Sequence, residues 1–268
     1  MRPFLADWLA LREPYDAQAR NPSVVQALLA ALGGLTSISI VDLACGTGAS
    51  LRALAPRLPM RQHWHLVDND LGLLQRAASL QSKNGVRVTT RAIDLVRDLE
   101  AALDGAVDLV TASAFFDLVS AEWLDRFVLE SAARRLPVYV ALAHDEIALH
   151  PSDANDAEVI AAVYRHQQCD KGFGPALGPA AAAAAIAAFR RAGYRVQSGR
   201  SDWRLEPGRD ADMQRAVLDA WAESAREERS LLLADVAAWL TRRGDLLAAG
   251  RSAMHLGHVD FLALPVPN

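Results

Sequence analysis

The chain has 268 residues, of which 51% are apolar and 22% charged, and its formal net charge is −4. This length allows one large α/β domain or two small ones, either of them with a full core. The acidic balance excludes the basic stripe that a nucleic-acid backbone needs, and two cysteines are too few for a disulfide framework. No apolar run approaches the roughly 20 residues that span a bilayer, and the charged N-terminus is unlike a signal peptide. We therefore expect a cytoplasmic protein without a nucleic-acid or membrane partner.

Short β-branched runs alternate with helical patterns through the first half of the chain. Residues 1–36 are predicted to form an N-terminal helical cap. Strands are predicted at 37–43, 63–68, 86–94, 106–113 and 136–143, with helical patterns between them. Strands that alternate with helices indicate right-handed βαβ units and a parallel sheet.

The second half is mainly helical. Helices are predicted at 153–168 and 178–193, a strand at 194–205, a pair of helices packed as a hairpin within 211–244, and a last strand at 253–265. We predict an α/β fold in which a doubly wound, mainly parallel sheet of seven strands occupies residues 37–268. Helical insertions at about 150–180 and about 208–244 are expected to cover one end of it.

The glycine-rich stretch VDLACGTG, residues 41–48, follows a predicted strand and opens a predicted helix, so its amide groups can face a ligand. Asp68 ends the second strand, where a carboxylate can accept hydrogen bonds from ribose hydroxyls. A dinucleotide fingerprint would need a third glycine at the position of Leu51. Asp42 at the loop entrance suits a cationic amine and sulfonium better than a pyrophosphate. The loop therefore favours S-adenosylmethionine over NAD, which remains the alternative.

Four segments in this order, VDLACGTG, LVDND, RAID and VDLVTASAFFDL, resemble the motifs of the class I S-adenosylmethionine-dependent methyltransferases. The first motif of that family reads acidic-x-Gly-x-Gly-x-Gly, and here Ala44 stands at its first glycine. The resemblance covers about residues 38–143. It implies a Rossmann-like fold, S-adenosyl-L-methionine as methyl donor and S-adenosyl-L-homocysteine as product.

The resemblance also implies roles for single residues. The methionine part of the cofactor is expected among the loop residues Asp42, Ala44, Cys45, Gly46 and Gly48. Asp68 is expected to bind the ribose with Asn69 beside it, Asp94 and Leu95 to meet the adenine, and Ser113 to flank the transferable methyl group. In the N-terminal helices, Tyr15 and Arg20 are candidates to contact the carboxylate of the cofactor. Cys45 is expected to pack under the cofactor and not to act as a nucleophile, and Asp70 to cap the next helix.

Ligands of doubly wound sheets lie beyond the carboxyl ends of the strands. There the stretches FFD (115–117), HDE (144–146), HQQCDKGFGPALGP (166–179) and SDWRL (201–205) are expected to form an acceptor pocket. The candidate pocket residues are Phe115, Phe116, His144, His166, Lys171, Phe173 and Trp203. His144 and His166 are the candidate catalytic bases for an acceptor that must lose a proton. The alternatives are core packing for the phenylalanines and a structural turn for 166–179.

No metal site is expected. His255 and His258 lie three apart on a predicted strand and therefore on opposite faces. His63 and His65 share a face but have no third ligand nearby in the sequence.

The leading functional hypothesis is methyl transfer to a small molecule. The amino-methylating nucleic-acid enzymes of the family often carry an Asn/Asp-Pro-Pro-aromatic motif where this chain reads SAFFD. One alternative is a protein or peptide methyltransferase with the helical insertion as docking surface and an open groove. Another is a catalytically idle relative that serves as a regulatory subunit. The oligomeric state, a homodimer included, stays open.

Overall fold

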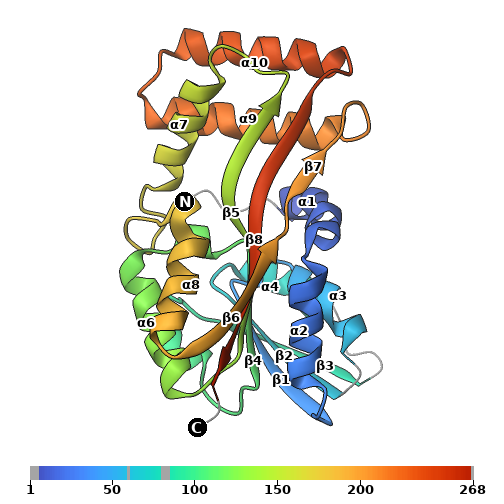
Figure 1. The fold of residues 1–268 in the computed structure, drawn as a ribbon, viewed down its shortest axis with the longest axis vertical. Helices are drawn as coiled ribbons and strands as arrows, with labels where there is room; N and C mark the ends of the chain where they lie inside the picture. Colours follow the sequence, from blue (N-terminus) through green and yellow to red (C-terminus); the bar gives the residue numbers. More distant parts are fainter. Residues whose placement is uncertain (1–5, 59–60, 80–84, 267–268) are drawn as a thin grey trace.

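One twisted sheet runs through the molecule, with helices on both faces (Figure 1). The structure is a computed structural model and describes residues 6–58, 61–79 and 85–266. The strand order is β3-β2-β1-β4-β5-β8-β6, and β7 pairs with β8 beside this path. The predicted N-terminal cap contains α1 (Ala6–Ala19) and α2 (Pro22–Leu32). Residues 1–5 of that cap and 267–268 lie outside the described residues.

The parallel part of the sheet follows the predicted order. Its strands are β1 (Ser37–Leu43), β2 (Arg61–Asp68), β3 (Val86–Ala92), β4 (Leu109–Ser113) and the first part of β5 (Val138–His150). The helices that connect them are α3 (Ala49–Leu54), α4 (Leu71–Ala78), α5 (Leu99–Ala102) and α6 (Ala121–Ala133). Both faces of the sheet are covered by apolar clusters, which is what a parallel sheet requires.

Side-chain caps fix where several helices begin. Asn21 accepts hydrogen bonds from the backbone of Ser23 and Val24 at the start of α2, next to Pro22 in the first turn. Asp70 caps α4, as expected, by accepting from the backbone of Gly72 and Leu73. Each cap binds amide groups that have no partner inside the helix, so these positions define the ends of the preceding loops.

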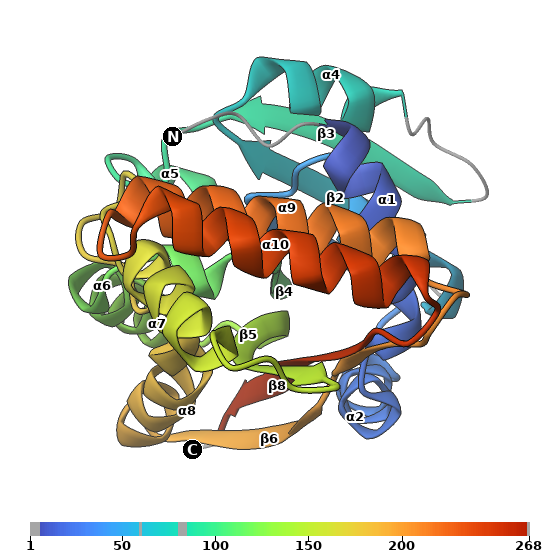
Figure 2. The ribbon, with the colours of Figure 1, turned by 90° about the horizontal axis from the view of Figure 1, so that it is seen from above.

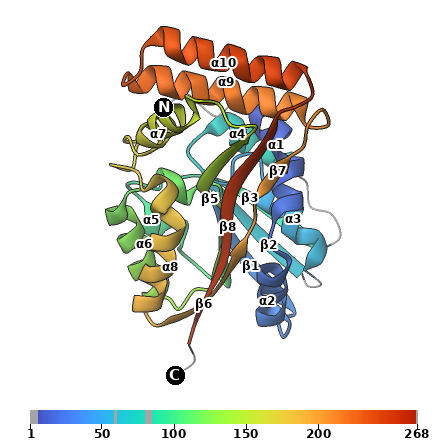
Figure 3. The ribbon, with the colours of Figure 1, turned by 45° about the horizontal axis from the view of Figure 1, so that its top comes forward.

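The fifth strand is longer than predicted. Val138–His150 continues past the parallel sheet because β8 (Ala253–Pro265) runs antiparallel to it and supplies partners as far as His150. Figures 1 and 3 show both strands rising toward the helices at the top of the molecule. The register shifts near Leu142, which has φ +58°. The stretch 144–146, expected to follow the fifth strand, therefore belongs to that strand.

The strand predicted at 194–205 is two strands, β6 (Tyr194–Arg200) and β7 (Trp203–Leu205), both paired with β8. Between them, Asp202 turns its side chain back to β8, where its Oδ1 accepts from the backbone N of His258 at 3.1 Å. A carboxylate in this position replaces a ladder bond and interrupts the strand. The sheet therefore has eight strands in place of the predicted seven.

The second half supplies α7 (Asp156–Gln167), α8 (Ala181–Arg191), α9 (Ala211–Glu228) and α10 (Leu233–Ala248). As predicted, α9 and α10 form a hairpin, and we call this pair the helical cover. Seen from above, the two helices lie side by side across the ends of β5 and β8 (Figure 2). Their apolar faces share a core cluster with α7, β5, β7 and β8. None of the helices in the described ranges is long and apolar enough to cross a membrane.

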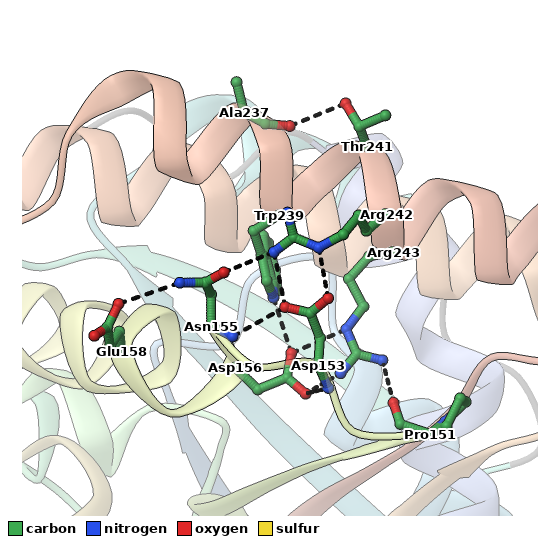
Figure 4. A network of polar contacts seen from close by, with 10 residues as sticks. All are labelled: Pro151, Asp153, Asn155, Asp156, Glu158, Ala237, Trp239, Thr241, Arg242 and Arg243. Carbon is green, nitrogen blue, oxygen red and sulfur yellow. Dashed lines mark hydrogen bonds and ion pairs between the residues drawn. The ribbon is translucent and has the colours of Figure 1, made fainter.

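A buried ion pair fastens the helical cover to the start of α7 (Figure 4). The guanidinium of Arg243 is fully buried and pairs with the carboxylate of Asp156, with its Nε 3.0 Å from Oδ1. The same carboxylate accepts from Nε1 of Trp239 at 2.9 Å, and Arg243 also donates to the carbonyl of Pro151 at 2.7 Å. With these partners the charged groups satisfy each other, and the cover is fixed to the top of β5.

Candidate active site

A pocket opens at the carboxyl ends of β1, β2 and β4, below α1. The empty space within it, including open solvent at the mouth, is about 1000 Å³. The lining residues are Leu9, Arg12, Asp16, Ala44, Cys45, Gly46, Thr47, Ala49, Ser50, Asp68, Asn69, Leu73, Ile93, Leu95, Ser113, Ala114, Phe115, Leu118 and Phe173. They include the predicted residues Ala44, Cys45, Gly46, Asp68, Asn69, Leu95, Ser113, Phe115 and Phe173.

The glycine-rich loop forms the floor of the pocket through three left-handed residues. Ala44 has φ +49°, Gly46 +54° and Gly48 +86°. The loop is held by hydrogen bonds from the backbone N of Gly46 to Oδ2 of Asp68 at 2.9 Å and from Gly48 to the carbonyl of Cys45 at 2.8 Å. Gly48 itself is the N-cap of α3 and is absent from the pocket lining. Glycine occupies two of these three positions, and at the third Ala44 carries a methyl group.

Asp68 stands at the rim of the floor and is almost buried. Its other oxygen, Oδ1, accepts from the backbone N of Asp70 at 2.9 Å. Burial raises the pKa of Asp68, while the backbone donors of Asp70 and Gly46 oppose that rise. The carboxylate is thus held in place by two amides and turned toward the pocket, with acceptor capacity left on both oxygens.

Asp94 does not line the pocket. Its carboxylate accepts from the backbone N of Val96 at 2.9 Å and lies 3.6 Å from the guanidinium of Arg97. The side chain therefore closes the turn after β3. The neighbours Ile93 and Leu95 supply the pocket wall there, and both are apolar.

Asp42 lies beneath the loop and is fully buried. The hydroxyl of Thr111 donates to its Oδ1 at 2.7 Å. Burial raises the pKa of Asp42 to about 6, although the hydroxyls of Thr111 and Ser50 oppose this. Burial also raises the pKa of the Cys45 thiol, with the charges of Asp42 and Asp68 adding to the effect. Cys45 is therefore a protonated thiol, which is a poor nucleophile.

Arg20 reaches the pocket only through Ser113. It is 4% exposed, with Nη1 3.3 Å from the hydroxyl of Tyr139 and Nη2 3.4 Å from the hydroxyl of Ser113. Ser113 lines the pocket and Arg20 does not. Arg20 thus supports the end of β4 from behind.

Tyr15 is turned away from the pocket, toward the helical cover, where its hydroxyl donates to Asp210 at 3.2 Å. The residues of α1 that line the pocket are Leu9, Arg12 and Asp16. Arg12 Nε donates to Oδ2 of Asp16 at 2.9 Å. The sequence analysis missed this pair. Its signal was the spacing of four between an arginine and an aspartate, which brings them to one face of a helix.

Phe115 and Phe173 form one wall of the pocket, with ring centroids 5.4 Å apart. Phe173 comes from the loop 166–179, which is tied down by a hydrogen bond from the backbone N of Leu177 to the carbonyl of Val119 at 2.8 Å. Phe116 is fully buried in the core and packs on Phe127, so the core alternative holds for it.

The structure does not bring His166 or Lys171 to the pocket. His166 lies on α7, and its Nε2 is 3.0 Å from the carboxylate of Glu227 on α9. Lys171 is absent from the pocket lining. Because α7 turns the side chain of His166 outward to α9, the loop 166–179 contributes to the wall mainly through Phe173.

His144, Trp203 and His258 form a buried aromatic cluster above the pocket. His144 and His258 are partners in the β5–β8 ladder, and their ring centroids are 5.4 Å apart. The ring of Trp203 lies 5.4 Å from that of His258, and the guanidinium of Arg12 lies 5.1 Å from the ring of Trp203. Burial lowers the pKa of His144 to about 4 and that of His258 well below its usual value. Both imidazoles are therefore neutral at pH 7.

The model of a methyltransferase domain family matches residues 40–137. This stretch contains the glycine-rich loop, Asp68, Asp94 and Ser113. This part of the chain is similar to a methyltransferase domain. The match lies where the four motifs predict a methyltransferase domain and is consistent with that family. A search among curated proteins found no match to the sequence.

Solved structures show the same fold over nearly the whole chain. The cyclopropane synthase MmaA2 from Mycobacterium tuberculosis aligns with a TM-score of 0.52 and 12% identity, over 97% of this chain and 94% of that one. The YcgJ protein from Bacillus subtilis aligns with a TM-score of 0.51 and 13% identity, over 92% of this chain and all of that one (100%). At these identities the similarity establishes the fold.

Proposed function

We propose that the enzyme transfers the methyl group of S-adenosylmethionine to a small molecule bound between the glycine-rich loop and the wall of Phe115 and Phe173. The observation that carries this proposal is the composition of the pocket. One side offers backbone amides and the carboxylate of Asp68, and the other offers aromatic and aliphatic side chains next to Ser113. Such a combination suits a polar cofactor on one side and a compact acceptor on the other.

The residues of the pocket fit the cofactor in the order that the motifs imply. Asp68 and Asn69 would hold the ribose, and the apolar side chains of Ile93 and Leu95 would enclose the adenine. The left-handed Gly46 keeps the loop backbone open to the methionine part, since a Cβ there would stand 3.3 Å from the side chain of Leu9. When bound, S-adenosylmethionine supplies a methyl group activated by its sulfonium. The protein then needs mainly to orient the acceptor and exclude water.

Two roles expected from the sequence change in this proposal. Asp42 would act from below the loop, where a buried carboxylate favours a cation above it. Arg12 would replace Tyr15 as the residue of α1 that faces the ligands, since Arg12 lines the pocket. His144 stays a candidate for contact with the acceptor, whereas the ion pair of His166 with Glu227 favours a structural role for His166.

We also propose that residues 37–268 act as the methyltransferase domain and that 1–36 act as its cap. Support comes from Leu9, Arg12 and Asp16 of α1, which close the pocket from above. The buried pair of Arg243 and Asp156 supports a fixed cover in place of the open groove that a protein acceptor would need.

Titration calorimetry with S-adenosylhomocysteine tests the cofactor site, with NAD as the comparison ligand. We expect S-adenosylhomocysteine alone to bind. Asp68→Asn should weaken binding by about tenfold or more, because a hydrogen bond to a charged acceptor contributes more than one to a neutral acceptor. Asp104→Asn is the matched control, since Asp104 lies on the surface with 68% of its side chain exposed.

Preferential binding of NAD would contradict the proposal. An unchanged affinity of a folded Asp68→Asn variant would remove Asp68 from the ribose site.

A further inference from the structure

Several polar atoms above the pocket are buried without a hydrogen-bond partner. Among the described residues they include Nε2 of His144, Nδ1 of His258, Nε1 of Trp203 and Oδ1 of Asp117. The side chains of the first three come from β5, β8 and β7 and are 9%, 4% and 3% exposed. Buried polar groups in folded proteins almost always have a partner, so such a gathering points to one that arrives from outside the chain.

This cluster adjoins the pocket through Arg12, although none of its three rings is among the pocket-lining residues. Arg12 lines the pocket and also lies over the ring of Trp203, so the two regions share one side chain. The end of β4 at Ser113 pairs with Ala141, and His144 follows three residues later on β5. At about 3.3 Å per residue, the histidine stands at most about 10 Å beyond the pocket floor. A molecule the size of one or two rings spans that distance.

Hydrogen bonds to the backbone determine which nitrogen of each imidazole carries the proton. His144 is hydrogen-bonded to the backbone of Gly257, and His258 to the backbone of Leu256. In both cases the bond favours the protonated ring, so the histidine N–H is the donor and a carbonyl accepts. A neutral imidazole has one N–H and one lone pair. The unpartnered Nε2 of His144 and Nδ1 of His258 are therefore lone pairs that can accept a hydrogen bond.

We infer that His144 and His258 bind the polar end of the methyl acceptor, and that this acceptor is a molecule of one or two rings with an O–H or N–H group. The inference deepens the proposed function and rests on it. The two lone pairs require a donor, and the aromatic wall of Phe115 and Phe173 requires an apolar body.

Charged groups around the pair come from every neighbouring element. Asp145 of β5 and Arg200 of β6 act on His144, and Asp202 acts on His258. Arg200 and Asp145 pair with each other, as do Arg200 and Asp202. Arg12 is in turn paired with Asp16. These charged groups pair with one another, and Nε2 of His144 and Nδ1 of His258 have no hydrogen-bond partner among the described residues.

A comparison of phenol with toluene tests this inference, because the two molecules have nearly the same shape and only phenol has a hydroxyl. Each is titrated into the enzyme saturated with S-adenosylhomocysteine, while the ring nitrogen signals of the seven histidines are followed by NMR. We expect phenol to shift the signals of His144 and His258 at a half-saturating concentration about tenfold lower than that of toluene. Equal effects of both probes, or no shift with phenol up to its solubility limit, would overturn the inference.

Variants of His144 separate the contribution of the imidazole lone pair to binding from that of the ring shape. His144→Phe keeps an aromatic ring and should abolish the preference for phenol, and His144→Gln restores an acceptor and should recover part of it. His63→Gln is the matched control, because His63 lies on the partly exposed face of β2 and contacts Thr89. The wild-type comparison of phenol with toluene remains decisive if His144→Phe does not fold.

Titration of S-adenosylhomocysteine into the wild type distinguishes the two proposals. Loss of that binding would sink the proposed function. Normal binding of S-adenosylhomocysteine without a preference for phenol would sink only the assignment of His144 and His258.

Discussion

Ala44 adopts a left-handed backbone conformation where β1 turns into the glycine-rich loop, with φ +49°. Such a conformation costs an L-residue about 1–2 kcal/mol. Glycine avoids this cost, but it loses more conformational entropy on folding, which offsets part of the gain. We expect Ala44→Gly to raise the free energy of unfolding by about 0.5–1 kcal/mol, as measured by urea denaturation.

Ala53→Gly, inside α3, is the control and should lower stability because glycine weakens a helix. A folded Ala44→Gly variant no more stable than the wild type would show that the methyl group is tolerated at this φ.

Asp42 makes stability depend on pH, because burial raises its pKa from 3.8 to about 6. Between these values the folded state binds a proton that the unfolded chain does not. The group therefore favours folding fully below pH 3.8, and that contribution is lost as the pH rises through about 6. The stability of the wild type minus that of Asp42→Asn should grow by up to about 3 kcal/mol between neutral and acidic pH.

Urea denaturation of both proteins across this range measures the difference. If it stays constant with pH, the carboxyl group of Asp42 titrates at its ordinary value in the folded protein.

The attachment of α10 to α7 depends on one fully buried cation. Arg243→Met would leave the carboxylate of Asp156 buried without its partner, which costs about 3–5 kcal/mol in comparable pairs. We expect that loss in urea denaturation, and faster hydrogen exchange along α10. Arg242→Met is the neighbouring control and should have only a small effect, since Arg242 binds Asp153 at the surface. Equal effects of the two substitutions would contradict a special role for the buried pair.

The elements that could be predicted from the sequence are those with a regular local signal. The runs SISIVDL and HWHLVD are β-branched or apolar and bounded by turns, and they form β1 and β2 with little change. The extension of β5 over 144–150 was missed because its pairing partner, β8, lies more than a hundred residues away. The break at Asp202 was missed for the same reason, since the bond that causes it reaches across to His258.

In the candidate site, too, the residues with a local sequence signal could be predicted, and those placed by long-range contacts could not. Residues on the glycine-rich loop and after β2 line the pocket as the motifs imply, because motif and position are local there. His166 and Tyr15 face other elements, since helix orientation decides where a side chain points. The places of Arg12 and Asp16 at the pocket and of His258 beside His144 could not be assigned, because only the tertiary fold brings α1 to the pocket and β8 to β5.

At the scale of the whole molecule, the helical cover and the cofactor pocket share no lining residue within the described ranges. Trp239 is fully buried in the cluster that joins the cover to β5 and β8. We expect Trp239→Ala to lower stability by about 3–5 kcal/mol. Below its unfolding temperature it should leave the affinity for S-adenosylhomocysteine within about twofold of the wild type, because effects at distant sites are nearly independent.

Calorimetry on the folded variant measures that affinity, with Asp68→Asn as the comparison that should weaken it. A large loss of affinity in a folded Trp239→Ala variant would mean that the cover and the pocket are energetically coupled.

Leu205 and Met254 are direct partners in the β7–β8 ladder. The chain that forms α9 and α10 therefore leaves the sheet and returns to it at neighbouring positions of one ladder. A segment attached in this way can be exchanged or lengthened at little entropic cost and without shifting the strands below. Evolution, or a protein engineer, can thus alter the helical cover while the glycine-rich floor stays as it is.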